Sequence, residues 1–361
     1  MLSSDIDISK SEFESKTFKY EPENSMPAVS VTGIRTSKPT TTSRSRGALS
    51  MLSRIRNALR EPMAEFLAVA IFVIFGAGAD AQVGVSADTR VVASRKGEYI
   101  STNFGWGIGL AMAVWISGGI SGGHVNPSIT LALAARRRFP WRKVPMYILA
   151  QTMGALVGAA LVYAQYARAI DIVEGGRGVR TLATAGFFSS FALDYMSSAS
   201  CFFSEFLGTA VLAFTIIATT DKKNSAAPPR GLLPLVLFLT LLGLGAALGM
   251  QTAFSFNPAR DFGPRLLLSM VGYGRKVYTY RNQYWLWCPI LGSILGAQAA
   301  AALYDITLQE WEYDLSGGDG VGRYASGPGA SLPAPVSAAV SVFHDHSFIP
   351  ICTLKSIGVR R

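Results

Sequence analysis

The sequence contains little charge for its length. Only 16% of the 361 residues are Asp, Glu, Lys or Arg, whereas 50% are hydrophobic and the mean hydropathy is positive. A soluble domain normally carries about a quarter charged residues. The composition therefore argues against an ordinary soluble enzyme or a nucleic-acid-binding domain, and it indicates a membrane protein.

Cysteine and histidine are also scarce. Cys201 and Cys288 fall in apolar stretches and Cys352 lies near the C-terminus, so the sequence has neither a CxxC pair nor an even set of cysteines. His344 and His346 have no cysteine or carboxylate cluster near them in the sequence that could complete a metal site. We therefore expect no metal and no cofactor. The apolar stretches also lack the Ser/His pair, paired acids or metal cluster that an intramembrane enzyme would need.

Long apolar runs dominate the chain instead. Six of them approach or exceed the roughly 20 residues that a helix needs to cross the hydrocarbon of a bilayer. They are 62–79, 103–121, 144–166, 201–220, 232–250 and 284–304. The sequence thus predicts an all-α membrane protein with six spans, and an even number places both termini on the same side.

Basic residues gather on one side of this arrangement. They precede the first span, and they fill the loops that follow the second and fourth spans, at 136–143 and 222–230. The positive-inside rule then favours cytoplasmic termini. Basic residues between 265 and 281 lie on the opposite side and weaken this bias.

The two ends of the chain differ from the middle. Residues 1–58 are rich in Ser, Thr, Pro and charge, which predicts a disordered cytoplasmic tail without a cleavable signal peptide. Its basic part, 35–60, is either a contact with an anionic leaflet or a topology signal on a solvated tail. Residues 306–361 include a Gly/Ser/Pro/Ala-rich stretch and predict a flexible cytoplasmic tail. The membrane domain is expected at 59–305.

The membrane domain consists of two similar halves. Glu65 stands in a Glu-Phe-Leu sequence near the start of span one, and Glu205 stands in the same sequence near the start of span four. Asn126-Pro127-Ser128 follows the second span, and Asn257-Pro258-Ala259 follows the fifth. Each half is therefore span, span, Asn-Pro half-span, span. Because three spans per half is odd, the second half must be inverted, which is an architecture used for transport across membranes.

The Asn-Pro pairs mark two helix starts. Asn is a favoured N-cap residue and Pro suits the first helical position. In an inverted repeat the two helices point their N-termini at each other, and each N-terminus carries about half a positive charge. Such a centre is expected to pass neutral hydrogen-bonding molecules and to repel cations and protons.

With both motifs in place, residues 60–305 resemble the aquaporin family (major intrinsic proteins), specifically its aquaglyceroporin branch. The repeats of the resemblance are at about 59–166 and 200–305. It implies six transmembrane helices with two re-entrant half-helices, arranged as a passive channel for glycerol and water in the bilayer. It also implies a homotetramer, and we expect a plasma-membrane location. The family usually carries Asn-Pro-Ala twice, whereas the first copy here ends in Ser128.

The resemblance also assigns site residues. The side chains of Asn126 and Asn257 match those that donate to passing oxygens. The four positions of the family's outer constriction correspond to Trp106, Gly245, Phe254 and Arg260. This set is typical of glycerol facilitators, because water-selective members usually carry His at the position of Gly245 and a small residue at that of Phe254. A polyol would meet apolar surface on one side and the Arg260 donors on the other.

Further residues match the family. Asp261, Arg265 and Pro289 resemble markers of the glycerol branch, although Ile290 stands where Leu is expected. Glu65 and Glu205 resemble buried glutamates that accept hydrogen bonds from the re-entrant loops, and His124 resembles a loop histidine with a structural role.

Two other interpretations remain open at this point. Glu65 and Glu205 could be relay carboxylates of an ion- or proton-coupled secondary transporter, which also uses inverted repeats. His124 could instead act as a pH-sensitive gate.

Overall fold

The computed structural model describes residues 43–309, 313–314 and 323–324, with side chains from residue 50 onward. In this part of the chain the long helices are α1 (Ser43–Val85), α2 (Tyr99–Ser117), α4 (Val144–Val173), α6 (Ser198–Thr220), α7 (Leu233–Leu248) and α10 (Ser293–Thr307). The shorter helices are α3 (Pro127–Arg136), α5 (Leu182–Ala185), α8 (Pro258–Met270) and α9 (Lys276–Thr279). The remaining elements are the single turns η1 (Trp141–Lys143) and η2 (Arg230–Leu232), the π-helix η3 (Leu286–Gly292), and the antiparallel strands β1 (Tyr313–Asp314) and β2 (Arg323–Tyr324).

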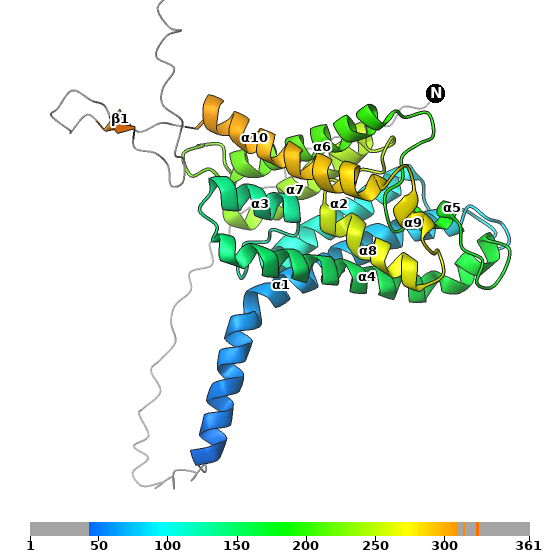
Figure 1. Ribbon diagram of the computed structural model, residues 1–361, viewed down its shortest axis with the longest axis horizontal. Coiled ribbons are helices and arrows are strands. Elements are labelled where there is room, and N and C mark those ends of the chain that lie inside the picture. The colour runs from blue at the N-terminus through cyan, green and yellow to red at the C-terminus, as the bar shows by residue number, and fades with distance from the viewer. Residues whose placement is uncertain (1–42, 310–312, 315–322, 325–361) are drawn as a thin grey trace, which may run out of the picture. The chain divides into compact units, whose positions relative to one another are not determined.

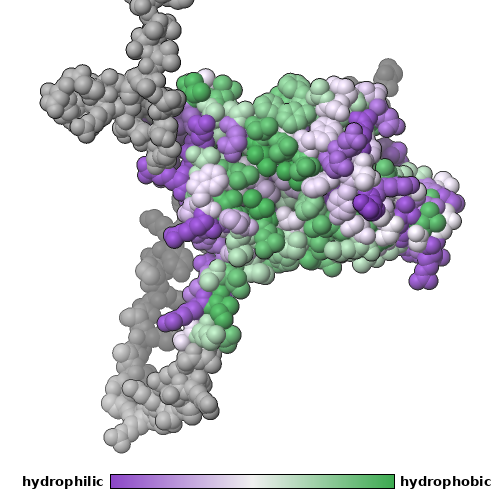
Figure 2. Space-filling model, viewed as in Figure 1, coloured by the Kyte–Doolittle hydropathy of each residue, from purple (hydrophilic) through white to green (hydrophobic). Residues whose placement is uncertain are grey.

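The structure confirms the all-α fold class with membrane-spanning helices. Five helices of the described part are long and apolar enough to cross a membrane by length and composition alone, and α2 is the sixth long helix of the bundle. Ser101, Thr102, Asn103 and the glycines at 105, 107 and 109 interrupt the apolar residues of α2. Figure 2 shows an apolar band across the helices, with polar surface at both ends of the bundle.

The predicted boundary between the N-terminal tail and the membrane domain differs from the start of α1 in the structure. Residues 43–58, expected to belong to a disordered tail, form the first part of α1. Ala, Leu, Met and Arg in this stretch are strong helix formers, so a helix nucleated in the apolar part extends back through it. Residues 1–42, most of 306–361, and the residues His344, His346 and Cys352 lie outside the described part of the chain.

The two halves pack by the same close approach. A side chain on Gly154 of α4 would collide with the carbonyl oxygen of Phe66 in α1. A side chain on Gly296 of α10 would collide in the same way with the carbonyl oxygen of Phe206 in α6. Glycine at these positions lets the helix backbones touch, which is how helices associate in membranes.

The short helices α3 and α8 lie between the long ones. Figure 1 shows α3 and α8 entering from opposite ends of the bundle, and the two helices meet at its centre. α3 packs against α4 and α10, while α8 packs against α4. Their N-termini thus converge on one place, and the loops that lead to them run there as well.

Candidate functional site

The site begins with the two asparagines that cap α3 and α8. The Asn126 side chain accepts a hydrogen bond from the Ser128 backbone N–H at 2.8 Å. The Asn257 side chain accepts from Ala259 N–H at 3.0 Å and from Arg260 N–H at 3.3 Å. Both prolines occupy the start of their helices. The sequence pattern therefore forms the helix starts that the propensities of Asn and Pro favour.

The other end of each amide reaches across to the opposite half. The Asn126 Nδ2 donates to the carbonyl oxygen of Phe256 at 2.8 Å, and the Asn257 Nδ2 donates to the carbonyl oxygen of Val125 at 2.8 Å. An amide nitrogen carries two hydrogens. One hydrogen of each asparagine is used in this reciprocal pair, and one remains for another acceptor.

Two buried glutamates hold the loops that precede the asparagines. Glu65 in α1 accepts from the backbone N–H groups of His124 at 3.0 Å and Val125 at 2.8 Å. Glu205 in α6 accepts from those of Ser255 at 3.1 Å and Phe256 at 2.8 Å. Because both carboxylates are fully buried, these bonds satisfy groups that would otherwise be costly to remove from water.

The backbone ahead of each asparagine is strained. Val125 has φ of 54° and Phe256 has φ of 49°, in the left-handed region that β-branched and bulky residues avoid. The glutamate bonds to the N–H groups of these two residues hold them there. The strained geometry turns the carbonyls of Val125 and Phe256 toward the asparagine of the other half.

His124 lies in a packed position beside this loop. Its ring is buried against Phe139 and Tyr147, with ring centroids 4.6 Å and 5.1 Å away. Its Nδ1 lies 3.2 Å from the Thr130 hydroxyl. These contacts fit a structural position in the loop.

A cavity of about 270 Å³ leads away from the asparagines. Apolar side chains of α1, α2, α6 and α7 line it, and the loop residues Gly122, Gly123 and His124 also border it. Its far end reaches Thr220 and Leu233, at the end of α6 and the start of α7. It has room for several water molecules, since each takes about 30 Å³ in the liquid.

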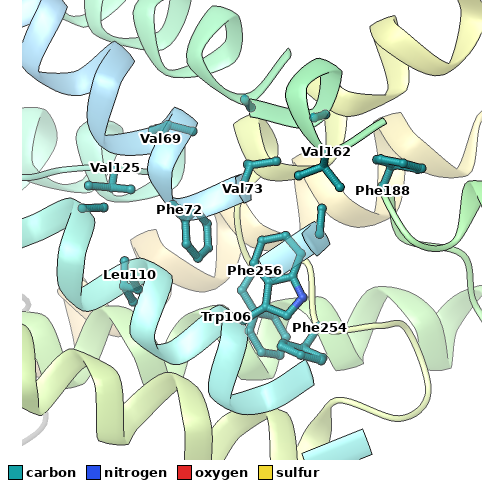
Figure 3. Packing of buried hydrophobic residues seen from close by; sticks show 14 of the residues in the cluster. Val69, Phe72, Val73, Trp106, Leu110, Val125, Val162, Phe188, Phe254 and Phe256 are labelled. Carbon is teal, nitrogen blue, oxygen red and sulfur yellow. The ribbon is translucent and has the colours of Figure 1, made fainter. Parts of the chain in front are cut away.

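Four other residues expected from the sequence, which are not part of this cavity lining, come together. The Arg260 guanidinium lies over the Trp106 ring, 4.2 Å from its centroid, and its Nη2 donates to the carbonyl oxygen of Ala253 at 3.4 Å. A Cβ at Gly245 would lie 3.3 Å from the Phe254 ring. Trp106, Phe254 and Phe256 belong to one buried cluster, part of which Figure 3 shows. We call the group Trp106, Gly245, Phe254 and Arg260 the constriction.

Polar groups that the sequence did not predict lie next to the constriction. Asp80 of α1 accepts from the Trp106 indole N–H at 2.9 Å. The Asn103 amide is buried beside Gly245, and its nitrogen and oxygen have no partner among the described residues. The Arg260 Nη1 is likewise buried without a partner in this part of the chain. Asp80 could have been identified from its spacing, because it follows Gly76 by four residues and Phe72 by eight and so lies on the same face of a helix.

Asp261 and Arg265 form a buried ion pair behind the constriction. Their side chains lie 2.9 Å apart, and Asp261 also accepts from the Ser190 backbone N–H at 2.8 Å. Arg265 donates to the carbonyl oxygens of Val277 at 2.6 Å and Ser190 at 2.8 Å. The pair thus joins α8 to α9 and to the segment between α5 and α6 that contains Ser190. The third of the residues that resemble markers of the glycerol branch, Pro289, lies in η3.

A family model described as Major intrinsic protein matches residues 51–304 of the chain. The chain belongs to the major intrinsic protein family.

Relatives and solved structures agree with this membership. An aquaporin of Laccaria bicolor is 60% identical over 262 residues, which are 73% of this chain and 79% of that protein. Aquaglyceroporin-9 of Botryotinia fuckeliana is 42% identical over 258 residues, or 70% of this chain and 55% of that protein. The X-ray structure of the aquaglyceroporin from Plasmodium falciparum is similar with a TM-score of 0.61 and 27% identity, covering 69% of this chain and 96% of that one.

This major intrinsic protein is therefore a multi-pass membrane channel for water and small solutes, and it is not an enzyme. The family membership also decides against a coupled secondary transporter. Glu65 and Glu205, which that interpretation needed as proton relays, are engaged by loop N–H groups.

Proposed function

We propose that this channel conducts glycerol together with water and excludes ions and protons. The observation that carries the proposal is the composition of the constriction, where the cationic fork of Arg260 stands against the aromatic surface of Trp106, 4.2 Å away. The buried Arg260 Nη1, which has no partner among the described residues, is a donor for a solute hydroxyl. Trp106 and Phe254 provide apolar surface for the carbon skeleton.

Gly245 supports the glycerol assignment further. A side chain there would approach the Asn103 amide oxygen to 2.7 Å and the Phe254 ring to 3.3 Å. A histidine at this position would enter the same space. Glycine leaves the constriction wide enough for a chain of carbons, so this position favours a polyol over a filter for water alone.

The centre of the pore supports the exclusion of ions and protons. The N-termini of α3 and α8 meet there, and their partial positive charges repel cations. One free N–H from each of Asn126 and Asn257 can donate to a passing oxygen. A water whose oxygen accepts both bonds is oriented by the protein, and this arrangement opposes proton transfer along a chain of waters.

The same proposal includes the setting of the channel. We place both termini in the cytoplasm, following the basic loops, and the channel in the plasma membrane as a homotetramer with one pore per subunit. Glu65, Glu205 and His124 act in it as anchors of the re-entrant loops rather than as groups that transfer protons.

Stopped-flow light scattering on liposomes tests the proposal. Vesicles that contain the full-length protein are mixed with a solution of higher osmolarity. An impermeant osmolyte in this solution measures water flux, and glycerol measures solute flux. We expect both rates to exceed those of protein-free vesicles, with no proton leak in a pH-gradient assay. Water flux without glycerol flux would reject the glycerol assignment, and electrogenic or pH-driven flux would reject passive conduction.

A further inference from the structure

We propose that Asp80 is a positioning residue of the constriction, which fixes the Trp106 indole and balances the charge of Arg260. The inference rests on the proposed function, because it explains how the constriction is held in a form that selects neutral polyols. Asp80 lies in α1, five residues before this helix ends, and it is partly exposed rather than buried.

A stripe along α1 forms the seat of Trp106. Phe72, Gly76 and Asp80 are spaced four residues apart, so they lie on one face of the helix. The Phe72 ring meets the Trp106 ring edge-on with centroids 5.0 Å apart, and any side chain on Gly76 would collide with the indole. Asp80 then accepts the indole N–H at 2.9 Å.

The three contacts differ in what they determine. Phe72 and Gly76 allow the indole to lie flat against α1, but apolar packing leaves its rotation in this plane weakly defined. A hydrogen bond from the N–H to a charged acceptor is directional, and it is stronger than a bond between neutral groups. Asp80 therefore sets which edge of Trp106 faces the Phe254 side of the pore and which edge faces α1.

The charge of Asp80 has a second consequence. Arg260 is buried, its ring partner Trp106 is the same residue that Asp80 holds, and the negative charge of Asp80 acts on the guanidinium. Among the other acids that act on Arg260, Asp261 is paired with Arg265 and Glu205 is engaged by loop N–H groups. Of these three acids, Asp80 is the one that approaches the constriction from α1.

Without Asp80, the pore would present two converging helix N-termini and an unbalanced arginine. This combination attracts anions, because helix N-termini and guanidinium groups both bind them. With Asp80 in place, Arg260 still offers its N–H donors to a hydroxyl. The net charge at the constriction stays close to zero, because the carboxylate of Asp80 offsets the guanidinium. The pairing accounts for how a pore that repels cations can also refuse anions.

Two substitutions separate the two roles. Asp80→Asn removes the charge but keeps an oxygen that accepts the indole N–H, whereas Asp80→Ala removes both. Asp88→Asn is the matched control, because Asp88 follows on the same segment and forms an exposed ion pair with Arg90 at 2.6 Å. Circular dichroism and size-exclusion chromatography check that each full-length variant folds.

The measurements are made on proteoliposomes. One readout is the rate of glycerol uptake divided by that of ribitol, a longer polyol. The other is nitrate entry into vesicles held at a fixed potential with K⁺ and valinomycin, alongside osmotic water flux. Each rate is normalised to the amount of protein incorporated.

We expect nitrate entry to rise about tenfold or more in both Asp80 variants, since a charge in a narrow pore is screened poorly. We expect the glycerol-to-ribitol ratio to fall on the order of threefold to tenfold in Asp80→Ala, the size of about one lost hydrogen bond, and to stay unchanged in Asp80→Asn. In a Trp106→Phe background, which lacks the indole N–H, Asp80→Ala should have no further effect on this ratio.

Wild-type selectivity and low nitrate entry in both Asp80 variants would overturn the inference. An equal loss of the ratio in Asp88→Asn would also overturn it, because the effect would then be unspecific. Nitrate entry is compared only with osmotic water flux and does not depend on glycerol conduction. It therefore decides the charge-balancing role of Asp80 even if the wild-type protein conducts no glycerol. Absence of glycerol flux in the wild type would count against the proposed function separately.

Discussion

At the scale of single residues, the space at Gly245 is shared with a neighbour. The Asn103 amide oxygen would lie 2.7 Å from a Cβ at this position, and the amide itself is buried with both polar atoms unpartnered in the described part of the chain. A buried amide without partners is costly unless something hydrogen-bonds to it. A permeating solute or water is a suitable partner, so the amide and the missing side chain together define the width of the constriction.

This geometry predicts the effect of Gly245→Ala. The added methyl group must displace the Asn103 amide or the Phe254 ring toward the pore, so we expect glycerol flux to fall about tenfold or more, in line with the effect of one methyl group in a closely fitting site. Water flux should fall less. The measurement is stopped-flow light scattering on proteoliposomes with both gradients.

Gly243→Ala is the matched control for this substitution. It lies two residues earlier in α7, and a Cβ there would meet nothing within 4 Å. Both changes increase helix propensity equally. Equal losses of glycerol flux in the two variants would contradict a specific role for the space at Gly245.

Residue-level prediction from the sequence depended on motifs. Asn126 and Asn257 can be recognised from the prolines that follow them. Trp106 and Phe254 can be located from their separation in the sequence from these motifs. Asp80 was missed because it stands at the end of an apolar run, where an acid looks like the first residue of a loop. The structure shows that α1 continues to Val85, and the hydrogen bond from the Trp106 N–H shows that Asp80 faces the constriction.

At the scale of helices, Asp221 connects α6 to α10. It follows the last residue of α6, and its carboxylate accepts from the Tyr304 hydroxyl of α10 at 2.7 Å and from the Lys223 backbone N–H at 2.9 Å. The hydrogen bond from the Lys223 N–H is the largest cause that holds the pKa of Asp221 below its ordinary value; burial opposes it, and the Tyr304 hydroxyl and nearby cations lower the pKa further. The charged carboxylate is thus the form that the folded protein prefers.

Asp221→Asn should therefore destabilise the protein at neutral pH. Because the pKa of Asp221 is lower in the folded than in the unfolded state, its contribution is present above the ordinary pKa and is lost as the pH falls through the lower folded value. We expect Tm in detergent to fall by a few degrees at pH 7, the effect of about 1 kcal/mol. The difference from wild type should shrink below about pH 4.

The exposed Asp194 supplies the comparison, since Asp194→Asn removes an acid at the surface of the opposite end of the bundle. It should leave Tm unchanged at both pH values. A pH-independent loss in Asp221→Asn would show that the side chain acts through its shape rather than its charge.

Helix boundaries were harder to predict than helix identity. The apolar runs located each long helix, but α4 extends seven residues past the predicted end at residue 166, because Ala167–Val173 continues with residues that a helix accepts. The π-helix η3 was not anticipated. Pro289 lacks a backbone N–H, so the helix cannot keep its regular ladder across this residue and widens locally.

At the scale of the whole molecule, the proposed orientation rests on loop charge. Lys96 lies in the segment between α1 and α2, and Arg230 lies in η2 between α6 and α7; both are exposed. The native Cys201 and Cys288 are buried. Single cysteines at these two loops therefore report opposite sides of the membrane against a silent background.

With Cys352→Ser as the parent, we expect Lys96→Cys to react with a membrane-impermeant maleimide on intact cells. Arg230→Cys should react only after the cells are permeabilised. Labelling is measured as a mass shift on a gel. The reverse pattern would place the termini outside the cell, and labelling of the parent would show that Cys201 or Cys288 is reachable.

The inverted arrangement was the most predictable property of the molecule, because two Asn-Pro motifs and two Glu-Phe-Leu sequences repeat in the same order. The contacts between the halves were not predictable from the sequence. The sequence shows that Asn126 and Asn257 correspond, but not that each donates to the carbonyl of the residue preceding the other.

This exchange of bonds has a consequence for biosynthesis. A ribosome delivers the first half to the membrane before the second half exists, and at that stage Asn126 has no Phe256 carbonyl to bind, while the carbonyl of Val125 has no amide. Both polar groups then lie at the depth of the bilayer, where an unpaired group is costly. The first half must therefore stay hydrated or shielded by the insertion machinery until the second arrives, and synthesis of the pore ends with its two halves closing on each other.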